Sequence, residues 1–296
     1  LALLAVGAWF LFFRKAPEPP VVAQEPTAER APVKQVAEIP KPIEPAPQIK
    51  PAETPPVKTA VSTPLPTETP PTPPQPTSLK FAGRNWVIRK SGTGEPGPNQ
   101  WNENNAFVDT EGLLHLKLSP TGNVWECVEV FTQEPLGFGL YQFQVISPVD
   151  KLNRNVVLGL FNQLTPDVRP DRTNEIHIEF SRRGNVVSPA GNYAVWPTKT
   201  GVTQVTRTFP IKLNGDYTTH RFLWNRDRVQ FQSIHGHHEQ GGDEFARWGF
   251  LPPNPAVAMP QQPMPVHLSL WCFKGKPPSD EKPVEVIIKS FSYTPI

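Results

Sequence analysis

The sequence is poor in cysteine and has no long segment with helical periodicity. Its two cysteines, Cys127 and Cys272, both lie in runs that look like β-strands. An exported domain can join such a pair in a disulfide, but isolated cysteines more often occur as plain buried side chains, and we favour that interpretation here. The missing 3.6-residue period argues against a helical fold.

Charge of one sign and the common cofactor signatures are also missing. The net charge is only +2 and the charges are mixed, which argues against a nucleic-acid partner. No P-loop, dinucleotide or Ser-His-Asp pattern occurs, so we expect no cofactor. His235, His237 and His238 with Glu239 sit in a Gly-flanked loop without a fixed geometry, so we predict no metal site. We expect a monomer.

Residues 16–78 lack glycine and aromatic residues altogether, and they hold 19 of the 39 prolines. Such a segment has too little apolar surface to offset the entropy of ordering it. We predict a disordered linker with polyproline II character.

The first 13 residues are apolar or glycine, and Arg14 and Lys15 follow them. This run is shorter than the roughly 20 residues that span a membrane, but an upstream continuation would complete a span. The alternative is the apolar part of a cleaved signal peptide, yet no small-residue cleavage site follows directly. We therefore predict that residues 1–15 are a signal anchor or signal segment, with the folded part of the chain outside the cytoplasm.

Residues 79–296 differ in composition from the preceding segment and are predicted to form one all-β domain. Short runs rich in β-branched and aromatic residues are separated by Gly, Pro, Asn and Asp, which predicts an antiparallel sandwich or jelly roll. The predicted strands are residues 113–118, 125–131, 141–146, 156–161, 175–180, 220–224, 229–233, 266–271 and 284–293.

Two of these runs alternate cleanly between apolar and polar residues. Because neighbouring side chains of a strand point to opposite faces, each run presents its polar residues on one face. That face is predicted to carry Glu175, His177 and Glu179 from one strand, and His267, Ser269 and Trp271 from another. Such a surface is a plausible platform for a ligand. Trp271 is expected in the cleft, Trp196 equally in the cleft or the core, and Trp86, Trp101 and Trp224 in the core.

Glu175 and Glu179 are two carboxylates on one strand face, four residues apart. Retaining glycosidases need two carboxyls about 5–5.5 Å apart, and long side chains on a curved strand can lean together to that distance. The pattern alone also fits an ordinary half-buried strand with a charged solvent face.

The motif Asn-Glu-Ile-His-Ile-Glu-Phe at residues 174–180 resembles the Glu-x-Asp-x-Glu catalytic strand of glycoside hydrolase family 16, the laminarinase and lichenase group. Other segments, in the same order, are similar to further strands of that family. They are residues 97–101, 107–116, 138–143, 156–161, 220–224, 229–231, 268–271 and 286–295. The resemblance implies a concanavalin-like β-jelly roll that acts on polysaccharide.

Carried over by this resemblance, Glu175 takes the place of the nucleophile and Glu179 that of the general acid/base. His177 stands where the family has an aspartate. An aspartate there would be a like charge that helps a neighbouring carboxyl to keep its proton, whereas an imidazolium favours both glutamates as anions. We predict that Trp271, Ser269, His267 and Trp196 contact the polysaccharide. Trp271 shares an outward face with Ser269 and His267, and the rings of Trp271 and Trp196 could stack on sugar rings.

The favoured function is a membrane-tethered retaining endo-glycoside hydrolase that cleaves a β-linked glucan or galactan. The alternative is a non-catalytic carbohydrate-binding module on the same fold, and a third possibility is an envelope protein with a vestigial cleft. Both glutamates favour the enzyme, and His177 favours the binding module.

Overall fold

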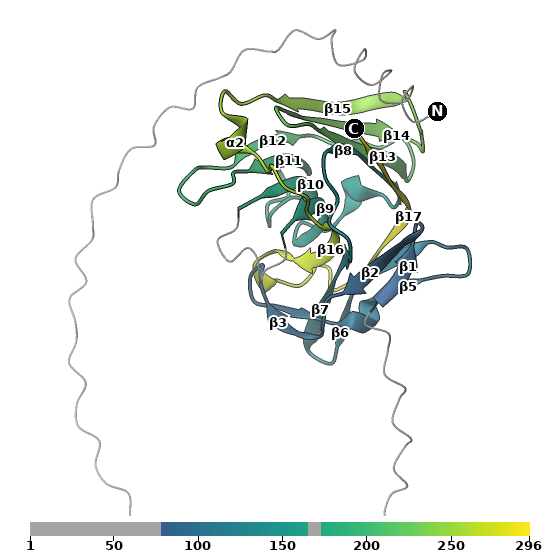
Figure 1. Ribbon diagram of the computed structural model, residues 1–296. Helices are drawn as coiled ribbons and strands as arrows, with labels where there is room; N and C mark the ends of the chain where they lie inside the picture. Colours follow the sequence, from purple (N-terminus) through teal and green to yellow (C-terminus); the bar gives the residue numbers. More distant parts are fainter. Residues whose placement is uncertain (1–77, 165–172) are drawn as a thin grey trace, which may run out of the picture. The chain divides into compact units, whose positions relative to one another are not determined.

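The computed structural model describes residues 78–164 and 173–296 and is dominated by β-strands (Figure 1). Each of the nine strands predicted from the sequence overlaps an observed strand, so the all-β fold class is confirmed. The predicted anchor and nearly all of the predicted linker lie outside the described residues and stay predictions. None of the described helices is long and apolar enough to cross a membrane.

The first sheet, sheet A, is antiparallel and carries the strand that holds Glu175 and Glu179. In spatial order its strands are β1 (Ser78–Phe81), β2 (Arg84–Ile88), β7 (Val124–Thr132), β16 (Val266–Cys272), β9 (Val156–Gln163), β10 (Glu175–Ser181), β11 (Gly191–Trp196) and β12 (Val205–Phe209). Strand β10 therefore lies between β9 and β11, well inside the sheet.

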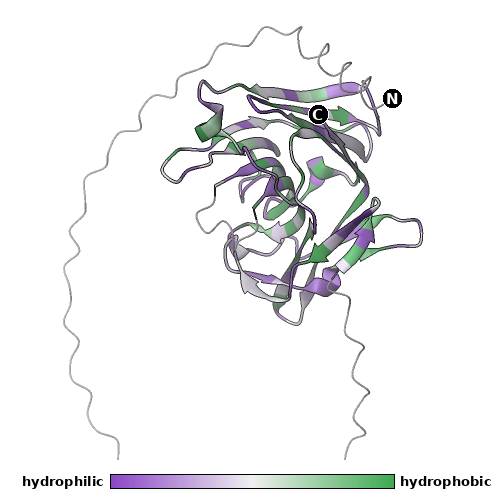
Figure 2. Cartoon of the chain, in the orientation of Figure 1, coloured by the Kyte–Doolittle hydropathy of each residue, from purple (hydrophilic) through white to green (hydrophobic). Residues whose placement is uncertain are grey.

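The second sheet, sheet C, is also antiparallel. In spatial order its strands are β5 (Ala106–Val108), β6 (Leu114–Thr121), β17 (Val284–Pro295), β8 (Gly139–Ile146), β13 (Tyr217–Trp224), β14 (Val229–His235) and β15 (Asp243–Phe250). Apolar and polar residues alternate along many strands (Figure 2), as expected for strands with one face on a core.

The remaining elements are short. Strands β3 (Gly92–Gly94) and β4 (Asn99–Trp101) form a small hairpin, and β4 pairs in parallel with one end of β7. The helical turns are η2 (Glu103–Asn105), η3 (Val149–Lys151), α2 (Pro255–Ala258) and η4 (Phe273–Gly275).

The inward faces of the two sheets make one large core. On sheet A, Ile176, Ile178 and Phe180 of β10 are each 0% exposed. On sheet C, Tyr141 stacks on Phe222 with ring centroids 4.6 Å apart. Burying a large apolar side chain contributes about 1.5–3 kcal/mol, so these rows fix which face of β10 looks inward. Trp86, Trp101 and Trp224 are all in the core, as expected.

A small polar network crosses this core. His220 of β13 is fully buried, and its ring nitrogens lie 2.9 Å from Oγ of Ser233 and 2.8 Å from Oγ1 of Thr218. The hydroxyl of Tyr193 from sheet A donates to the same Ser233 oxygen at 2.7 Å. Both ring nitrogens of His220 are therefore satisfied by hydroxyls, which suits a neutral imidazole.

A second polar network lies on the outer face of sheet C and surrounds Arg221, which is 0% exposed. The guanidinium donates to Gln142, to the carbonyl of His238 and, at 3.2 Å, to Oε1 of Gln232. Gln142 in turn donates to Glu239 at 3.1 Å. The loop that joins β14 to β15 thus covers a buried arginine.

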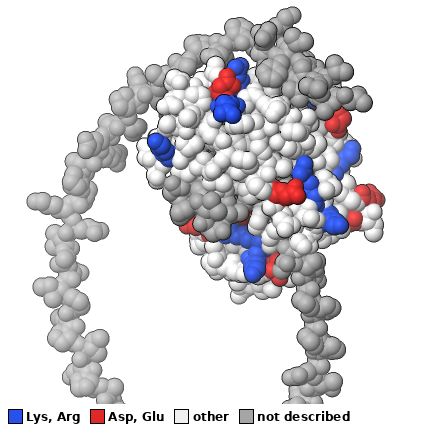
Figure 3. All heavy atoms as spheres, in the orientation of Figure 1, with Lys and Arg blue, Asp and Glu red and all other residues white. Residues whose placement is uncertain are grey.

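On the face of the molecule shown in Figure 3, acidic and basic side chains lie beside one another.

Cys127 and Cys272 are both buried and are not joined in a disulfide. The Asn99 side chain links them, because its Oδ1 accepts from the Cys127 thiol at 3.4 Å and its Nδ2 donates to the Cys272 carbonyl at 3.0 Å. The two thiols are therefore packed as core side chains, which is the interpretation the sequence favoured.

Candidate functional site

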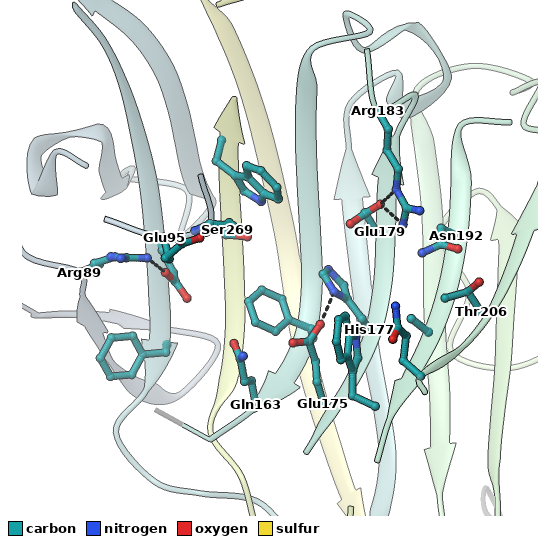
Figure 4. Close-up of a pocket in the computed structure, with 18 of the residues that line it drawn as sticks. Arg89, Glu95, Gln163, Glu175, His177, Glu179, Arg183, Asn192, Thr206 and Ser269 are labelled. Atoms are coloured by element: carbon teal, nitrogen blue, oxygen red, sulfur yellow. Dashed lines mark hydrogen bonds and ion pairs between the residues drawn. The ribbon is translucent and has the colours of Figure 1, made fainter. Parts of the chain in front are cut away.

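A pocket of about 480 Å³ opens on the face of sheet A opposite the core (Figure 4). Its volume lies in the range of about 300–1,000 Å³ that small-molecule sites occupy. The lining residues are Arg89, Glu95, Pro96, Trp101, Glu129, Phe131, Phe161, Gln163, Glu175, His177, Glu179, Arg183, Asn192, Ala194, Trp196, Gln204, Thr206, Ser269 and Trp271. The pocket therefore combines aromatic rings with carboxylates, amides and hydroxyls.

Strand β10 places three charged side chains in this pocket. Because Ile176 and Ile178 point into the core, Glu175, His177 and Glu179 must point out of the opposite face, and all three line the pocket. Figure 4 shows the imidazole of His177 between the two carboxylates.

A row of four rings crosses the pocket side of sheet A, one ring from each of four adjacent strands. The rings are those of Phe131, His267, Phe161 and His177, and each is the direct cross-strand partner of the next. Successive ring centroids lie 5.2, 4.9 and 4.6 Å apart. Cross-strand ring pairs of this kind stabilise a sheet and hold its side chains in one arrangement.

His267 lies within this row but does not line the pocket. Its flanking phenylalanine rings leave it 1% exposed. Its Nδ1 lies 2.8 Å from Oε1 of Glu129, and its Nε2 lies 3.2 Å from the carbonyl of Gln163. Alternation put His267 on the correct face, but its neighbours cover it, so it supports the pocket wall through Glu129.

The carboxylate of Glu175 is bonded to His177. Nδ1 of the imidazole lies 2.6 Å from Oε1 of Glu175, and both side chains are about nine-tenths buried. Although burial disfavours the charged imidazolium, the bond to Glu175 and the charges of Glu175 and Glu179 raise the pKa of His177 above its ordinary value. The pair is therefore best described as imidazolium and carboxylate.

The carboxylate of Glu179 is bonded to Arg183, in the turn that follows β10. Nε and Nη2 of the guanidinium lie 3.0 and 2.8 Å from the same oxygen, Oε1. The Glu179 side chain is 12% exposed and the Arg183 side chain is 47% exposed. Two charge-assisted hydrogen bonds from one guanidinium to one carboxylate oxygen hold the Glu179 side chain in place.

A third ion pair lies on the opposite wall. Nη1 of Arg89 donates to Oε2 of Glu129 at 2.8 Å, and the guanidinium stacks over Trp101 at 3.9 Å from the ring centroid. Burial works against the charge of Glu129, but His267 and Arg89 outweigh it and lower the pKa of Glu129 below its ordinary value. This carboxylate is held as an anion too.

The structure brings together most of the residues expected from the sequence. Glu175, His177, Glu179, Ser269, Trp196 and Trp271 all line the pocket, and His267 does not. The sequence analysis missed Arg89, Glu129, Arg183 and Asn192. Glu129 had a signal, since it alternates with the buried Val128 and Val130, whereas Arg183 lies in a turn without periodicity.

The backbone beneath His177 leaves no room for another side chain. Gly159 lies opposite Ser269 on one side, and a Cβ at this position would come within 2.8 Å of the Ser269 hydroxyl and 2.9 Å of Nε2 of His177. Both side chains would have to move. The glycine therefore lets His177 and Ser269 pack closely at the pocket floor.

Solved structures with a similar fold include β-glucanases. A β-glucanase of Bacillus licheniformis superposes with a TM-score of 0.54 at 19% identity, over 75% of this chain and 100% of that one. A glycosyl hydrolase family 16 protein of Mycobacterium smegmatis gives 0.52 at 16% identity, over 74% and 93%. The chain has the jelly-roll fold of the β-glucanases. The predicted resemblance in fold to glycoside hydrolase family 16 is thus confirmed.

The same fold also occurs in a protein described as a pseudo-enzyme. An immunostimulatory antigen and pseudo β-1,3-glucanase of Mycobacterium tuberculosis superposes with a TM-score of 0.55 at 18% identity, over 75% of this chain and 93% of that one. No protein-family model matches the chain, and no curated protein matches it. At these identities the β-glucanase fold does not distinguish a catalytic protein from a binding protein. The chemistry of the pocket has to distinguish them.

Proposed function

We propose that the pocket binds a neutral β-linked polysaccharide and does not cleave it. The observation that carries this proposal is the pairing of both β10 carboxylates with cations, Glu175 with His177 and Glu179 with Arg183. Retaining hydrolysis needs one carboxyl ionised and the other protonated, so that it can protonate the leaving oxygen. Two ion-paired carboxylates provide acceptors for sugar hydroxyls but no acid.

The walls of the pocket suit a sugar chain. Trp196 and Trp271 are both half-buried and line the pocket, and aromatic rings of this kind can pack against the apolar faces of sugar rings. The two guanidiniums that line it, on Arg89 and Arg183, are already bonded to glutamates. They offer little to an acidic polymer, and this favours a neutral one.

Retaining hydrolysis is the second candidate, and one observation favours it. Glu175 and Glu179 lie four residues apart on the same face of one strand, and both line one pocket. Release of sugar from a β-glucan, lost on Glu175→Gln, would support this second candidate.

Binding should depend on Trp271. We expect the wild-type protein to bind β-1,3-glucan or mixed-linkage β-1,3-1,4-glucan in affinity electrophoresis without releasing reducing sugar. Trp271→Ala should weaken that binding about 10- to 100-fold. Stacking of a nucleic-acid base on an aromatic ring contributes about 1–3 kcal/mol, and we expect a sugar ring packed on Trp271 to contribute a similar amount. The thermal midpoint should change little by comparison.

Trp125→Ala is the matched control for this experiment. Trp125 is also half-buried on a strand of sheet A but does not line the pocket. If both variants bind as tightly as the wild type, the pocket is not the glycan site. Unfolding of Trp271→Ala alone would show that Trp271 acts in the core.

We also propose that residues 1–15 anchor the chain in a membrane and that residues 16–78 hold the folded domain away from it, outside the cytoplasm. The apolar run before Arg14 and the proline-rich composition support this arrangement. Protease added to intact cells should then cut residues 16–78 and release a stable fragment that begins near residue 79. Cleavage only after lysis would contradict the proposed location.

A further inference from the structure

The arrangement around Glu179 differs from that around Glu175 in how it is built. Glu175 is paired with His177 of its own strand, and both side chains are about nine-tenths buried. Arg183, in contrast, lies in the turn after β10, and its side chain is 47% exposed. Among the described residues its guanidinium is bonded to Glu179 alone. A single, largely exposed side chain, that of Arg183, therefore supplies the cation that pairs with Glu179.

The backbone of Arg183 shows that this position can be changed at low cost. Its φ is +49°, in the left-handed region that β-carbon-bearing residues seldom occupy and that asparagine tolerates well. Its amide donates to Oγ of Ser181 at 3.0 Å, which any non-proline residue can repeat. An asparagine here keeps the turn and removes the positive charge.

We propose that Arg183, together with His177, holds this site in its binding state, and that replacing both residues uncovers retaining hydrolysis by Glu175 and Glu179. This inference rests on the proposed polysaccharide binding. Arg183 acts through Glu179 and is a positioning residue, because it bonds to the carboxyl that would supply the proton.

The chemistry that would be uncovered needs only water as a co-reactant. Glu179 as a carboxylic acid gives its proton to the glycosidic oxygen while the bond from that oxygen to C1 breaks. The Glu175 carboxylate forms a bond to C1 in the same step. Water then attacks C1 and gives a proton to the Glu179 carboxylate, and the bond between Glu175 and C1 breaks. Each glutamate ends in its starting state.

His177 and Arg183 block different parts of this cycle. The imidazolium of His177 is bonded at 2.6 Å to Oε1 of Glu175, on the carboxylate that would attack C1. The guanidinium of Arg183 occupies Oε1 of Glu179 with two donated hydrogen bonds and places a positive charge beside the carboxyl that would supply the proton. Aspartate at position 177 would instead add a like charge between the glutamates and help one of the three carboxyls to stay protonated. Changing only one residue leaves the other block in place.

The test compares four proteins on β-1,3-glucan and mixed-linkage β-1,3-1,4-glucan. These are the wild type, His177→Asp, Arg183→Asn and the double variant. The double variant should release reducing sugar at least about 100-fold faster than the wild type or either single variant, since general acid catalysis contributes about 10²–10⁴-fold. Its pH profile should be bell-shaped, with one limb for each carboxyl.

Three further variants serve as controls. Glu175→Gln in the double variant should abolish the gained hydrolysis. His177→Asp with Arg183→Lys keeps a cation beside Glu179, and its rate of hydrolysis should rise little. His177→Asp with Arg207→Asn removes the same charge from an exposed position of β12 that does not line the pocket, and it should behave like His177→Asp alone.

A second measurement works even if aspartate at position 177 prevents folding. Both Arg183 and the Glu179 carboxylate that it bonds act on the pKa of His177, so Arg183→Asn should shift that pKa in an NMR titration. Arg183→Lys should leave it near the wild-type value. An unchanged titration in Arg183→Asn would show that Arg183 does not act on the glutamate–histidine cluster, and would overturn the inference.

The outcomes separate this inference from the proposed function. A folded double variant that binds glucan with wild-type affinity and releases no sugar between pH 4 and 8 overturns the inference and leaves the binding function intact. If neither the wild type nor any variant binds these glucans, the proposed function is wrong, and the inference that rests on it is wrong as well.

Discussion

Arg221→Met should lower the free energy of unfolding by about 3–5 kcal/mol in urea denaturation. Methionine fills a similar volume but donates no hydrogen bonds. Gln142, Gln232 and the carbonyl of His238 would each lose a donor beneath the loop that joins β14 and β15. A buried acceptor left without its partner costs about 1–3 kcal/mol, and three of them account for the expected loss.

Arg228→Met is the matched control for this variant. Arg228 lies at the turn of the same β13–β14 hairpin, but its side chain is 39% exposed and pairs with the adjacent Asp227. An exposed ion pair contributes at most about 1 kcal/mol. Equal losses in the two variants would mean that the network around Arg221 contributes no more to the free energy of unfolding than an exposed ion pair does.

The second large effect should be a loss of stability in acid that depends on His220. Burial between the sheets, with a smaller effect from His237, lowers the pKa of His220 from 6.5 to about 3. Below pH 6.5 the unfolded chain binds a proton at this residue that the folded chain does not bind. Stability from His220 is therefore present above pH 6.5 and falls by about 1.4 kcal/mol for each pH unit below it.

Comparison with His220→Gln isolates this effect from the carboxylates, which also titrate in acid. Glutamine can donate to and accept from the same Ser233 and Thr218 hydroxyls but does not titrate. The stability advantage of the wild type over the variant should shrink by about 3 kcal/mol between pH 7 and pH 4. Parallel stability curves would contradict the buried neutral imidazole.

The fold could be predicted from the sequence because its signals are local. Each alternating run commits one face to the core, so Ile176, Ile178 and Phe180 determine where Glu175, His177 and Glu179 point. The order of the runs then matched a known jelly roll. Tertiary packing adds what alternation cannot supply, namely which residues of the outer face become covered.

His267 and Arg183 show the two limits of this reasoning. Alternation gives the side of the sheet for His267, but the rings of Phe131 and Phe161 that cover it come from other strands. Arg183 lies in a turn, where no period exists, and reaches Glu179 only because the chain reverses there. The charge balance of the pocket therefore became visible only in three dimensions, although the sequence analysis had already singled out His177 as a residue that would alter it.

The pairing of charges in the pocket also affects how a ligand would arrive. Three carboxylates that each contact a cation within 3 Å form dipoles, and the field of a dipole decays faster with distance than that of a single charge. At physiological salt the potential of such pairs is screened within roughly 8 Å. Long-range attraction then contributes little to the rate of encounter. A polymer would reach this pocket by diffusion, and the fit of its surface would determine how long it stays.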